Sequence, residues 1–410
     1  MDNKLPKDWK IKTLGEVCKL KNGFAFKSDN YLNEGIPVIR ISDIKDGLIV
    51  PRNTVHVSEN SNYDGYVINE NEIIVAMSGA TTGKFGIYKS KEKAYQNQRV
   101  GKFDIIDKTI LDNNFLLHQL HSLKRQIEKD AYGGAQPNIS SKKIEEMEIV
   151  LPPLQTQQAI VSKIEELFSE LDKGIEDLKT AQQQLKTYRQ SVLKWAFEGK
   201  LTNENVKDGE LPKGWKIVDL KECCEVKRGK SKHRPRNAPE LYGGKYPFIQ
   251  TGDIRNANGG YIKRFSQTYN EIGLAQSKLW PKGTLCITIA ANIGETALLD
   301  FDACFPDSVV GLLSKKDILF NKYLNYFFIS FKQKLEELAP ATAQKNVNVD
   351  ILEKVNIPLP PIEEQNLIVQ EIESRLSVAD KMEESIMQSL QQAEALRQSI
   401  LKKAFSGQLL

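Results

Sequence analysis

One glycine-rich segment of the 410-residue chain has residue types that could bind a phosphate, Gly79-Ala80-Thr81-Thr82-Gly83-Lys84-Phe85. A P-loop has one more residue between its glycines and carries a Ser or Thr after its lysine, because that hydroxyl binds magnesium. Here Phe85 follows Lys84, and the counterpart at 290–295 has no lysine. We therefore interpret the segment as a turn, with Lys84 as a candidate phosphate contact.

The other residues that could do chemistry form no catalytic or metal-binding pattern. None of the four histidines has a cysteine partner at metal-ligand spacing: His56, His118, His121 and His233. We expect His118 and His121 to lie on a solvated helix face. Asp43 and Asp253 recur in turn contexts, which predicts capping rather than acid–base catalysis. Neither a G-x-G-x-x-G motif after an expected strand nor an amino-methyltransferase motif occurs, so we expect a non-catalytic chain without a metal or cofactor of its own.

A basic segment is the strongest local indication of a partner. It contains six Lys or Arg residues in ten and no acid: Lys227, Arg228, Lys230, Lys232, Arg234 and Arg236. Such a segment can neutralise DNA phosphates, and its arginines can pair with guanine edges in the major groove. The alternative is a solubilising loop, which fits the same charge pattern.

Isolated cations elsewhere are further candidates for DNA contact, although each is a surface cation by default: Lys21, Lys27, Arg40, Lys45, Lys84 and Arg255. The net charge of +4 is too small for this length to identify a partner. Five cysteines, an odd number without a C-x-x-C pair, indicate reduced core thiols. No apolar run approaches the length of a membrane span and no signal-peptide pattern occurs, so we expect a cytoplasmic protein.

The elements that must position these residues occur twice. Leu5–Lys10 returns as Leu211–Lys216, and Leu151-Pro152-Pro153-Leu154 returns as Leu359-Pro360-Pro361-Ile362. The offset drifts from 206 to 210 within the first part of the repeat and then stays at 208. Insertions confined to the first part indicate a loop-rich domain followed by an element of constrained length.

The constrained element is expected to be a helix, at about Leu154–Glu198 and again at about Ile362–Ser406. The first copy has a heptad-like seam at Ile160, Ile164, Leu167, Leu171, Gly174, Leu178, Ala181, Leu185, Tyr188, Val192 and Trp195. The second copy keeps Ile368, Ile372, Ile386, Leu396 and Ile400, with Arg375, Ser389 and Lys403 at other seam positions. Each helix would be about 68 Å long. Eleven residues, Lys200–Glu210, span only about 40 Å, which favours an antiparallel coiled coil with pseudo-twofold symmetry.

Each globular half is predicted to be a mixed α/β (α+β) domain. Short β-rich runs and later helical stretches support this class: Ile36–Ile41, Glu72–Met77, Tyr246–Gln250 and Thr284–Ala290 as strands, with Leu111–Lys129 and Ile318–Leu338 as helices. The expected organisation is a first domain at 1–150, a helix at 151–199, a linker at 200–210, a second domain at 211–358 and a second helix at 359–410.

Several motifs resemble the specificity subunits of type I restriction-modification enzymes. They are the segments 149–161 and 357–369 around the paired prolines, Asn22–Ser28, the Ala-Gln-x-Asn motifs at Ala135 and Ala343, Phe305–Gly311, and Arg397–Leu401. The resemblance covers the whole chain in the order recognition domain, helix, recognition domain, helix. It implies that each domain recognises one half of a bipartite, asymmetric DNA sequence.

The resemblance also implies partners. The helices would set the spacing and dock two methyltransferase subunits, and motor-nuclease subunits would join the holoenzyme. S-adenosylmethionine, ATP and magnesium would then be bound by those partners, where adenine is methylated. An exposed helix face including Trp195, Phe197 and Phe405 is the candidate docking surface. Two alternatives stand beside this function: a coiled-coil structural adaptor that never contacts DNA, and the recognition subunit of another restriction or methylation system.

Overall fold

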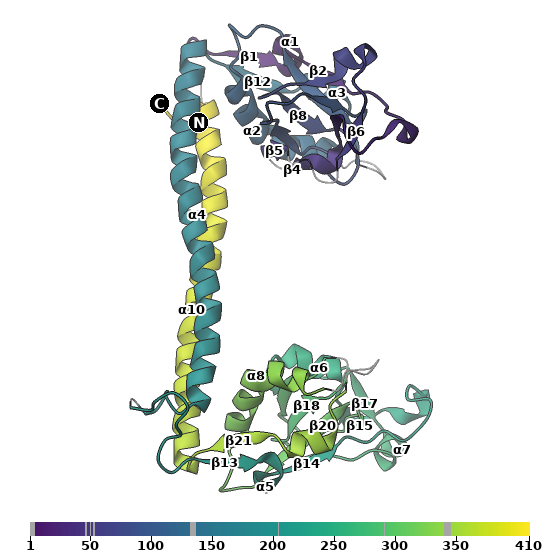
Figure 1. Cartoon of the computed structure of the whole chain (residues 1–410), viewed down its shortest axis with the longest axis vertical. Coiled ribbons are helices and arrows are strands. Elements are labelled where there is room, and N and C mark those ends of the chain that lie inside the picture. The colour runs from purple at the N-terminus through teal and green to yellow at the C-terminus, as the bar shows by residue number, and fades with distance from the viewer. Residues whose placement is uncertain are drawn as a thin grey trace. The chain divides into compact units, whose positions relative to one another are not determined.

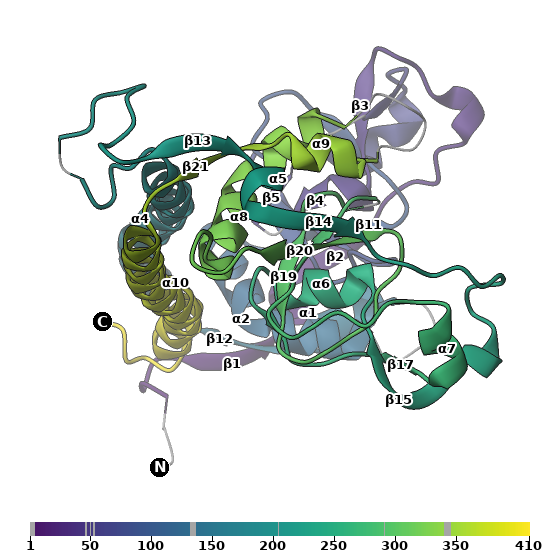
Figure 2. The same ribbon diagram turned by 90° about the horizontal axis from the view of Figure 1, so that it is seen from below.

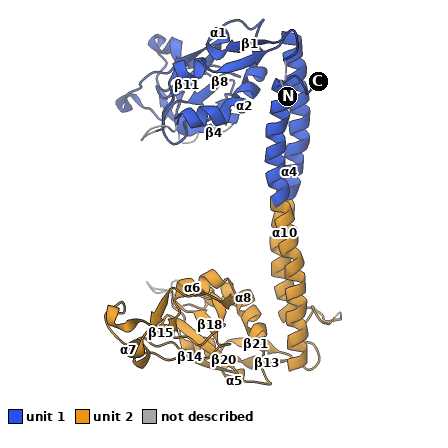
Figure 3. Cartoon of the chain, turned by 180° about the vertical axis from the view of Figure 1, so that it is seen from behind, with its two compact units in different colours: residues 1–178, 388–410 blue, residues 179–387 orange. Residues whose placement is uncertain are grey.

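A computed structural model describes residues 5–45, 47–49, 51, 54–131, 137–203, 205–290, 292–339 and 346–410. The chain forms two compact units (Figure 3), one of residues 1–178 with 388–410 and the other of residues 179–387. Each unit combines one globular domain with parts of both long helices. The motif residues Ala135-Gln136 and Ala343-Gln344-Lys345 lie outside the described residues.

The domain of the first unit is built on a six-stranded sheet of order β2-β11-β8-β9-β5-β4, with a four-stranded sheet β6-β3-β10-β7 and the pair β1-β12. Its strands are β1 (Lys10–Thr13), β2 (Cys18–Asn22), β3 (Ile36–Ile39), β4 (Ile44–Lys45), β5 (Gly47–Ile49), β6 (Val55–Val57), β7 (Val67–Ile68), β8 (Ile73–Ala76), β9 (Phe85–Ile87), β10 (Ala94–Gln96), β11 (Val100–Ile105) and β12 (Glu148–Leu151). Its helices are α1 (Leu14–Val17), α2 (Asn113–Ala131) and α3 (Ser141–Glu145). All four residues of β8 are buried, as expected for a continuous apolar strand inside a domain.

The domain of the second unit has a five-stranded sheet of order β14-β20-β18-β19-β16 and the pairs β15-β17 and β13-β21. Its strands are β13 (Lys216–Asp219), β14 (Cys224–Arg228), β15 (Tyr242–Phe248), β16 (Tyr261–Ile262), β17 (Gln267–Tyr269), β18 (Leu285–Thr288), β19 (Thr296–Leu299), β20 (Val309–Ser314) and β21 (Asn356–Leu359). Its helices are α5 (Leu220–Cys223), α6 (Thr251–Ala257), α7 (Glu271–Ala275), α8 (Asn321–Glu337) and α9 (Val349–Glu353). The mixed α/β class predicted for both halves is confirmed, with α2 and α8 at the predicted helices.

The two long helices are α4 (Leu154–Phe197) and α10 (Ile362–Phe405), of 44 residues each. Both end before a glycine with positive φ, Gly199 at 78° and Gly407 at 74°. Helices often end at such a residue, because glycine adopts this left-handed conformation without a steric penalty. Within the first unit Arg397 pairs with Asp172, and within the second Arg189 Nη1 lies 2.6 Å from Asp380 Oδ1. These pairs join the late part of each helix to the earlier part of the other. The predicted antiparallel pairing is therefore confirmed, and the helices lie side by side in Figures 1 and 2.

The predicted seam was wrong by one residue along part of each helix. Gly174, Tyr188, Trp195, Leu396 and Lys403 are exposed. The buried and half-buried positions in these parts of the helices include Leu171, Ile175, Leu178, Ala181, Leu185, Arg189, Val192 and Ala196 in α4, and Ala379, Glu383, Ile386, Ser389, Ala393, Arg397, Ile400 and Ala404 in α10. Both arginines are half-buried, and each directs its guanidinium to a carboxylate on the other helix, Arg397 to Asp172 and Arg189 to Asp380 and Glu383. The prediction searched for apolar residues only, so it placed Tyr188 and Leu396 in the seam instead of their neighbours Arg189 and Arg397.

The predicted solvated position of His118 was also wrong. Its side chain is 7% exposed on α2, with its ring 5.8 Å from that of Phe168 in α4. Burial, with a smaller contribution from His121, lowers the pKa of His118 to about 4. The imidazole is therefore neutral at physiological pH and belongs to the interface between α2 and α4.

Candidate nucleic-acid interface

The basic segment Lys227–Arg236 begins in β14 and continues past Gly229. A Cβ atom at Gly229 would lie 2.2 Å from the carbonyl oxygen of Pro306, so only glycine allows this close approach. The approach places the segment beside Asp307. Arg236 Nη2 lies 2.7 Å from Asp307 Oδ2, and Arg228 Nε donates to the Asp307 carbonyl. A carboxylate distant in sequence therefore neutralises part of a segment that contains no acid of its own.

Further acidic neighbours reduce the charge of this segment. Lys227 pairs with Glu225, and His233 Nε2 lies 3.5 Å from Glu240. Within the described residues Arg228, Lys230, Lys232 and Arg234 make no ion pair, although Arg228 donates to one backbone carbonyl and Arg234 to two. Four of the six candidate cations, Arg228 among them, therefore remain without a carboxylate partner and are the stronger candidates for phosphate contact.

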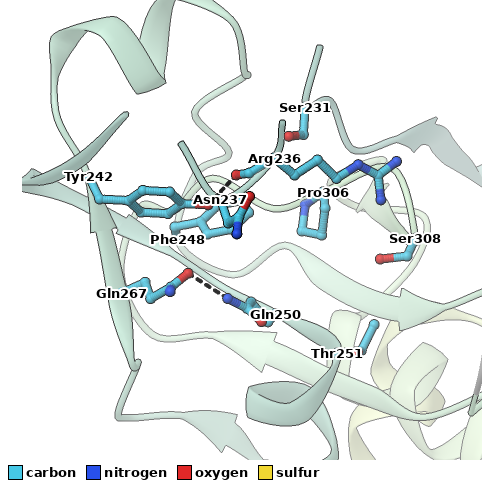
Figure 4. Close-up of a pocket in the computed structure, with 10 residues that line it drawn as sticks. All are labelled: Ser231, Arg236, Asn237, Tyr242, Phe248, Gln250, Thr251, Gln267, Pro306 and Ser308. Atoms are coloured by element: carbon cyan, nitrogen blue, oxygen red, sulfur yellow. Dashed lines mark hydrogen bonds between the residues drawn. The ribbon is translucent and has the colours of Figure 1, made fainter. Parts of the chain in front are cut away.

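A cavity of about 300 Å³ opens beside this segment (Figure 4). Its lining combines aromatic rings, amides, hydroxyls and one guanidinium: Ser231, Arg236, Asn237, Tyr242, Phe248, Gln250, Thr251, Gln267, Pro306 and Ser308. The Tyr242 hydroxyl donates to the Arg236 carbonyl at 2.6 Å, and Gln250 Nε2 donates to Gln267 Oε1 at 2.5 Å. Phe248 stacks on Tyr269 with ring centroids 4.1 Å apart. The cavity therefore has a packed aromatic side and a hydrogen-bonding side.

A second basic cluster lies next to the cavity and was not identified from the sequence. Lys263 and Arg264 line a hollow of about 520 Å³ together with Asp253, Asn256 and the exposed Tyr261 and Phe265. The predicted candidate Arg255 is exposed on α6 nearby. None of these three cations has an ion pair among the residues that the structure describes. Basic residues between two aromatic ones, Tyr261-Ile262-Lys263-Arg264-Phe265, were the available sequence signal.

The candidates of the first domain are more dispersed. Lys21 lies on β2 with its Nζ 2.5 Å from Asp104 Oδ2, so its charge is paired. Lys27, Lys45 and Lys84 are exposed, and Arg40 is half-buried. The Thr81 hydroxyl donates to the Ile41 carbonyl at 3.1 Å. The structure therefore brings the turn before Lys84 beside the Arg40 segment.

Two predictions for local structure in these regions are confirmed. The Asp43 carboxylate accepts from the backbone N–H of Arg40 at 2.8 Å, and the Asp253 carboxylate accepts from that of Gln250 at 2.8 Å, so both aspartates are capping residues. Gly79 and Gly83 have φ values of 86° and 84° and form the predicted turn. Arg40 and Gln250 therefore occupy equivalent, capped positions in the two domains.

The structure places two of the three candidate docking aromatics in contacts within the chain. The ring of Phe197 lies 5.2 Å from Tyr323 and 5.4 Å from Phe327 in α8, and that of Phe405 lies 5.5 Å from Phe115 in α2. These two rings pack each helix end against a domain rather than forming an open face. Trp195 is 39% exposed and stays a predicted docking residue.

Two buried glutamines that the sequence analysis did not identify fix the start of each long helix. Gln157 Nε2 donates to the carbonyls of Ile110 at 2.7 Å and Pro152 at 2.8 Å, and its Oε1 accepts from the Asp112 N–H at 2.9 Å. Gln365 makes the same set of bonds with the residues 208 positions later, Ile318, Pro360 and Phe320. The available signal was a glutamine at the same distance from both proline pairs.

The described residues offer little reactive chemistry. They contain no group of three or more His, Cys, Asp or Glu side chains placed to hold a metal ion. All five cysteines are free and buried, as predicted. Burial raises the pKa of Cys18 to about 12 and that of Cys223 to about 11, which disfavours the nucleophilic thiolate. Among the described helices, none has the length and apolarity needed to cross a membrane.

Comparison with known proteins identifies the family. The family model of the type I restriction modification DNA specificity domain matches residues 6–180 and 212–392. The Escherichia coli type I restriction enzyme EcoBI specificity subunit is 27% identical over 432 residues, covering 98% of this chain and 86% of the relative. The MjaVIII specificity subunit of Methanocaldococcus jannaschii is 25% identical, covering 88% of this chain and 84% of the relative.

Two solved structures share the fold. A chain from work on complex assembly and conformational transition of the type I R-M system superposes with a TM-score of 0.76 at 21% identity, covering 99% of both chains. The HsdS subunit from Thermoanaerobacter tengcongensis superposes with a TM-score of 0.64 at 21% identity, covering 99% of this chain and 98% of its own. With its two matched domains, each followed by a long helix, the chain belongs to the type I restriction-modification DNA specificity family.

Proposed function

We propose that the chain is the sequence-specific DNA-recognition subunit of a type I restriction-modification enzyme. Each domain recognises one half of a bipartite, asymmetric site, while the helices set the spacing and dock two methyltransferase subunits. The observation that carries this proposal is that the two domains share the same scaffold but differ in their surfaces. The joints at Gln157 and Gln365 match bond for bond.

The surfaces beside these joints differ between the two domains. Arg40 stands where the second domain has Gln250, and the single 3₁₀ turn Ile41–Asp43 is replaced by helix α6. Two domains that recognise different half-sites need a common support with different contact residues, because base edges are distinguished by hydrogen-bonding pattern. A structural adaptor has no such need.

Catalysis is assigned to partner subunits. We propose that methyltransferase subunits bind S-adenosylmethionine and methylate adenine, and that motor-nuclease subunits use ATP and magnesium. The kinship with proteins named specificity subunits supports this division.

The test is co-expression of the full chain with the methyltransferase subunit of its system, followed by sequencing of host DNA for N6-methyladenine. A bipartite methylated motif that requires the chain is the expected result. A stable complex that produces no motif, or a motif that persists without the chain, would contradict the proposed function.

A further inference from the structure

Large apolar side chains are exposed unequally on the two long helices. The structure describes every residue of α4 and α10, and seven such side chains are exposed there. Only Leu396 belongs to the first unit, and the other six belong to the second (Figure 3). These six are Tyr188 and Trp195 in α4, and Leu367, Val378, Met382 and Met387 in α10. Burial of the seam alone does not account for this difference.

Two of the six side chains point away from the second domain near the end of α4 and the start of α10. A step of two residues turns a helix by about 200°, so residues two positions apart lie on opposite sides. Trp195 stands between Leu193 and Phe197, which both pack against the core of the second domain. Leu367 stands two residues before Val369, which is buried in the same core. Trp195 and Leu367 therefore lie on the side of the coil that the domain does not cover.

The same reasoning places three further side chains on this side. Lys186 and Asp380 line a hollow between the coil and the end of α6, so they face the domain. Tyr188 is two residues from Lys186, and Val378 and Met382 are each two residues from Asp380. The ion pair of Asp380 with the residue after Tyr188 brings the two helices to the same level here. The apolar face of the second unit is therefore defined by Tyr188, Trp195, Leu367, Val378 and Met382.

The equivalent face of the first unit has a different chemistry. The constant offset of 208 relates the five residues of the apolar face to five exposed residues of the first unit. These equivalents are Ala159, Glu170, Gly174, Leu396 and Lys403. One large apolar side chain, two small residues and two charges therefore stand where the second unit has five large apolar side chains.

The apolar face is large enough to form the centre of a stable interface. Tyr188 and Trp195 are 37% and 39% exposed, and the three residues on α10 are 52–56% exposed. An enclosed aromatic side chain buries about 150–250 Å², so the five side chains together offer roughly 400 Å². This is about half of the roughly 800 Å² that each partner contributes to an ordinary stable complex, in which the centre of the interface is apolar. Contiguous apolar patches of this size often mark an interaction site.

The occupant follows from the two docked methyltransferase subunits of the proposed function. Two copies of one subunit present the same surface, whereas the two faces that receive them differ. A surface that covers the apolar face on the second unit would have to desolvate Glu170 and Lys403 on the first. Burial of a charge without a partner is costly, so the same subunit binds the two faces with different affinities.

We propose that the apolar face of the second unit is the high-affinity docking site for a methyltransferase subunit, and that the equivalent face of the first unit is a weaker site for the other copy. This inference rests on the proposed function and adds to it the docking residues and the order of assembly. A complex with one methyltransferase subunit, bound to the second unit, therefore forms before the complex with two.

The test is titration of the full chain with the purified methyltransferase subunit of its system, with stoichiometry from native mass spectrometry and affinities from sedimentation velocity. Trp195→Lys and Val378→Glu each introduce the residue that stands at the equivalent position of the first unit. Met387→Lys is the matched control, because Met387 is exposed on α10 but lies outside the apolar face, about 140° around the helix from Met382. Thermal melting establishes that each variant is folded.

The wild-type chain and Met387→Lys are expected to bind two methyltransferase subunits in steps whose dissociation constants differ by at least about tenfold. Trp195→Lys and Val378→Glu should each weaken the tighter step by roughly 10- to 100-fold, as expected for residues at the centre of an interface. Two equal steps for the wild-type chain, or a tighter step that both folded variants leave unchanged, would overturn the inference while the proposed function stands.

Two other outcomes identify what else would be wrong. If the chain alone formed a dimer that Trp195→Lys dissociated and the methyltransferase subunit did not displace, a second copy would occupy the apolar face and the inference would fail. If the wild-type chain bound no methyltransferase subunit at all, the inference and the proposed function would both fail.

Discussion

Replacement of Gln157 by alanine should loosen the joint between the first domain and α4. The carboxamide satisfies three backbone groups, those of Ile110, Asp112 and Pro152, at 2.7–2.9 Å, and the side chain is fully buried. Each buried group left without a partner costs about 1–3 kcal/mol. Because water can partly replace the lost side chain, we expect a destabilisation of about 3–5 kcal/mol for Gln157→Ala.

The matched control is Gln158→Ala, since Gln158 is the exposed neighbour on the same helical turn. A change at such a surface position should stay within about 0.5 kcal/mol. Hydrogen exchange of the amides at 110–116 and 154–160 measures the local opening directly. A cost of 3 kcal/mol corresponds to exchange about 100-fold faster than in the control. Equal exchange rates in the two variants would refute the role of Gln157 as the clamp of this joint.

Three further predictions concern the helices and their contacts. The folded-state pKa of His118 lies near 4, below its ordinary value of 6.5. The contribution of His118 to stability is therefore present above pH 6.5 and is lost as the pH falls toward 4. Unfolding titrations should show that the free energy of unfolding falls by about 2 kcal/mol between pH 7 and 5, and His118→Phe should remove this loss. Gly174→Ala changes an open and exposed helical position, so it should raise the free energy of unfolding by about 0.5–1 kcal/mol. Gly199→Ala changes a residue at positive φ, and a proline ring would lie 2.2 Å from the new Cβ, so it should lower the free energy of unfolding by more than about 1 kcal/mol. Thermal melts compare the two variants. A double-mutant cycle of Arg189→Met and Asp380→Asn should give a coupling energy of about 0.5–1 kcal/mol. This coupling energy should fall with added salt, since the carboxylate is largely exposed. A coupling energy of zero at low salt would contradict the ion pair.

The sequence predicted the features that follow from repetition and periodicity. Two copies at a constant offset of 208 predicted the long helices, and the short linker between them predicted their antiparallel pairing, which Asp172–Arg397 and Arg189–Asp380 confirm. Alternating strands and helices predicted the mixed domains. These features are encoded in local patterns that need no knowledge of distant contacts.

The features that sequence analysis did not predict depend on contacts between residues far apart in the chain. Asp307 neutralises Arg236 across 71 positions, so the net charge of the basic segment is not visible in its own sequence. His118 is buried by α4, and the seam arginines are accommodated by carboxylates on the other helix. The pairing of Gln250 with Gln267 likewise requires strand β17 to lie beside β15.

The most direct measurement of the central claim is the methylated motif produced by a chimaera in which a copy of residues 5–150 replaces the second domain, 211–358. If each domain recognises its own half-site and the helices run antiparallel, the two identical domains should direct the methyltransferase subunits to an inverted repeat of the half-site of the first domain. The wild-type chain in the same host should give an asymmetric bipartite motif. An unchanged asymmetric motif from the folded chimaera, or a direct repeat, would contradict the account.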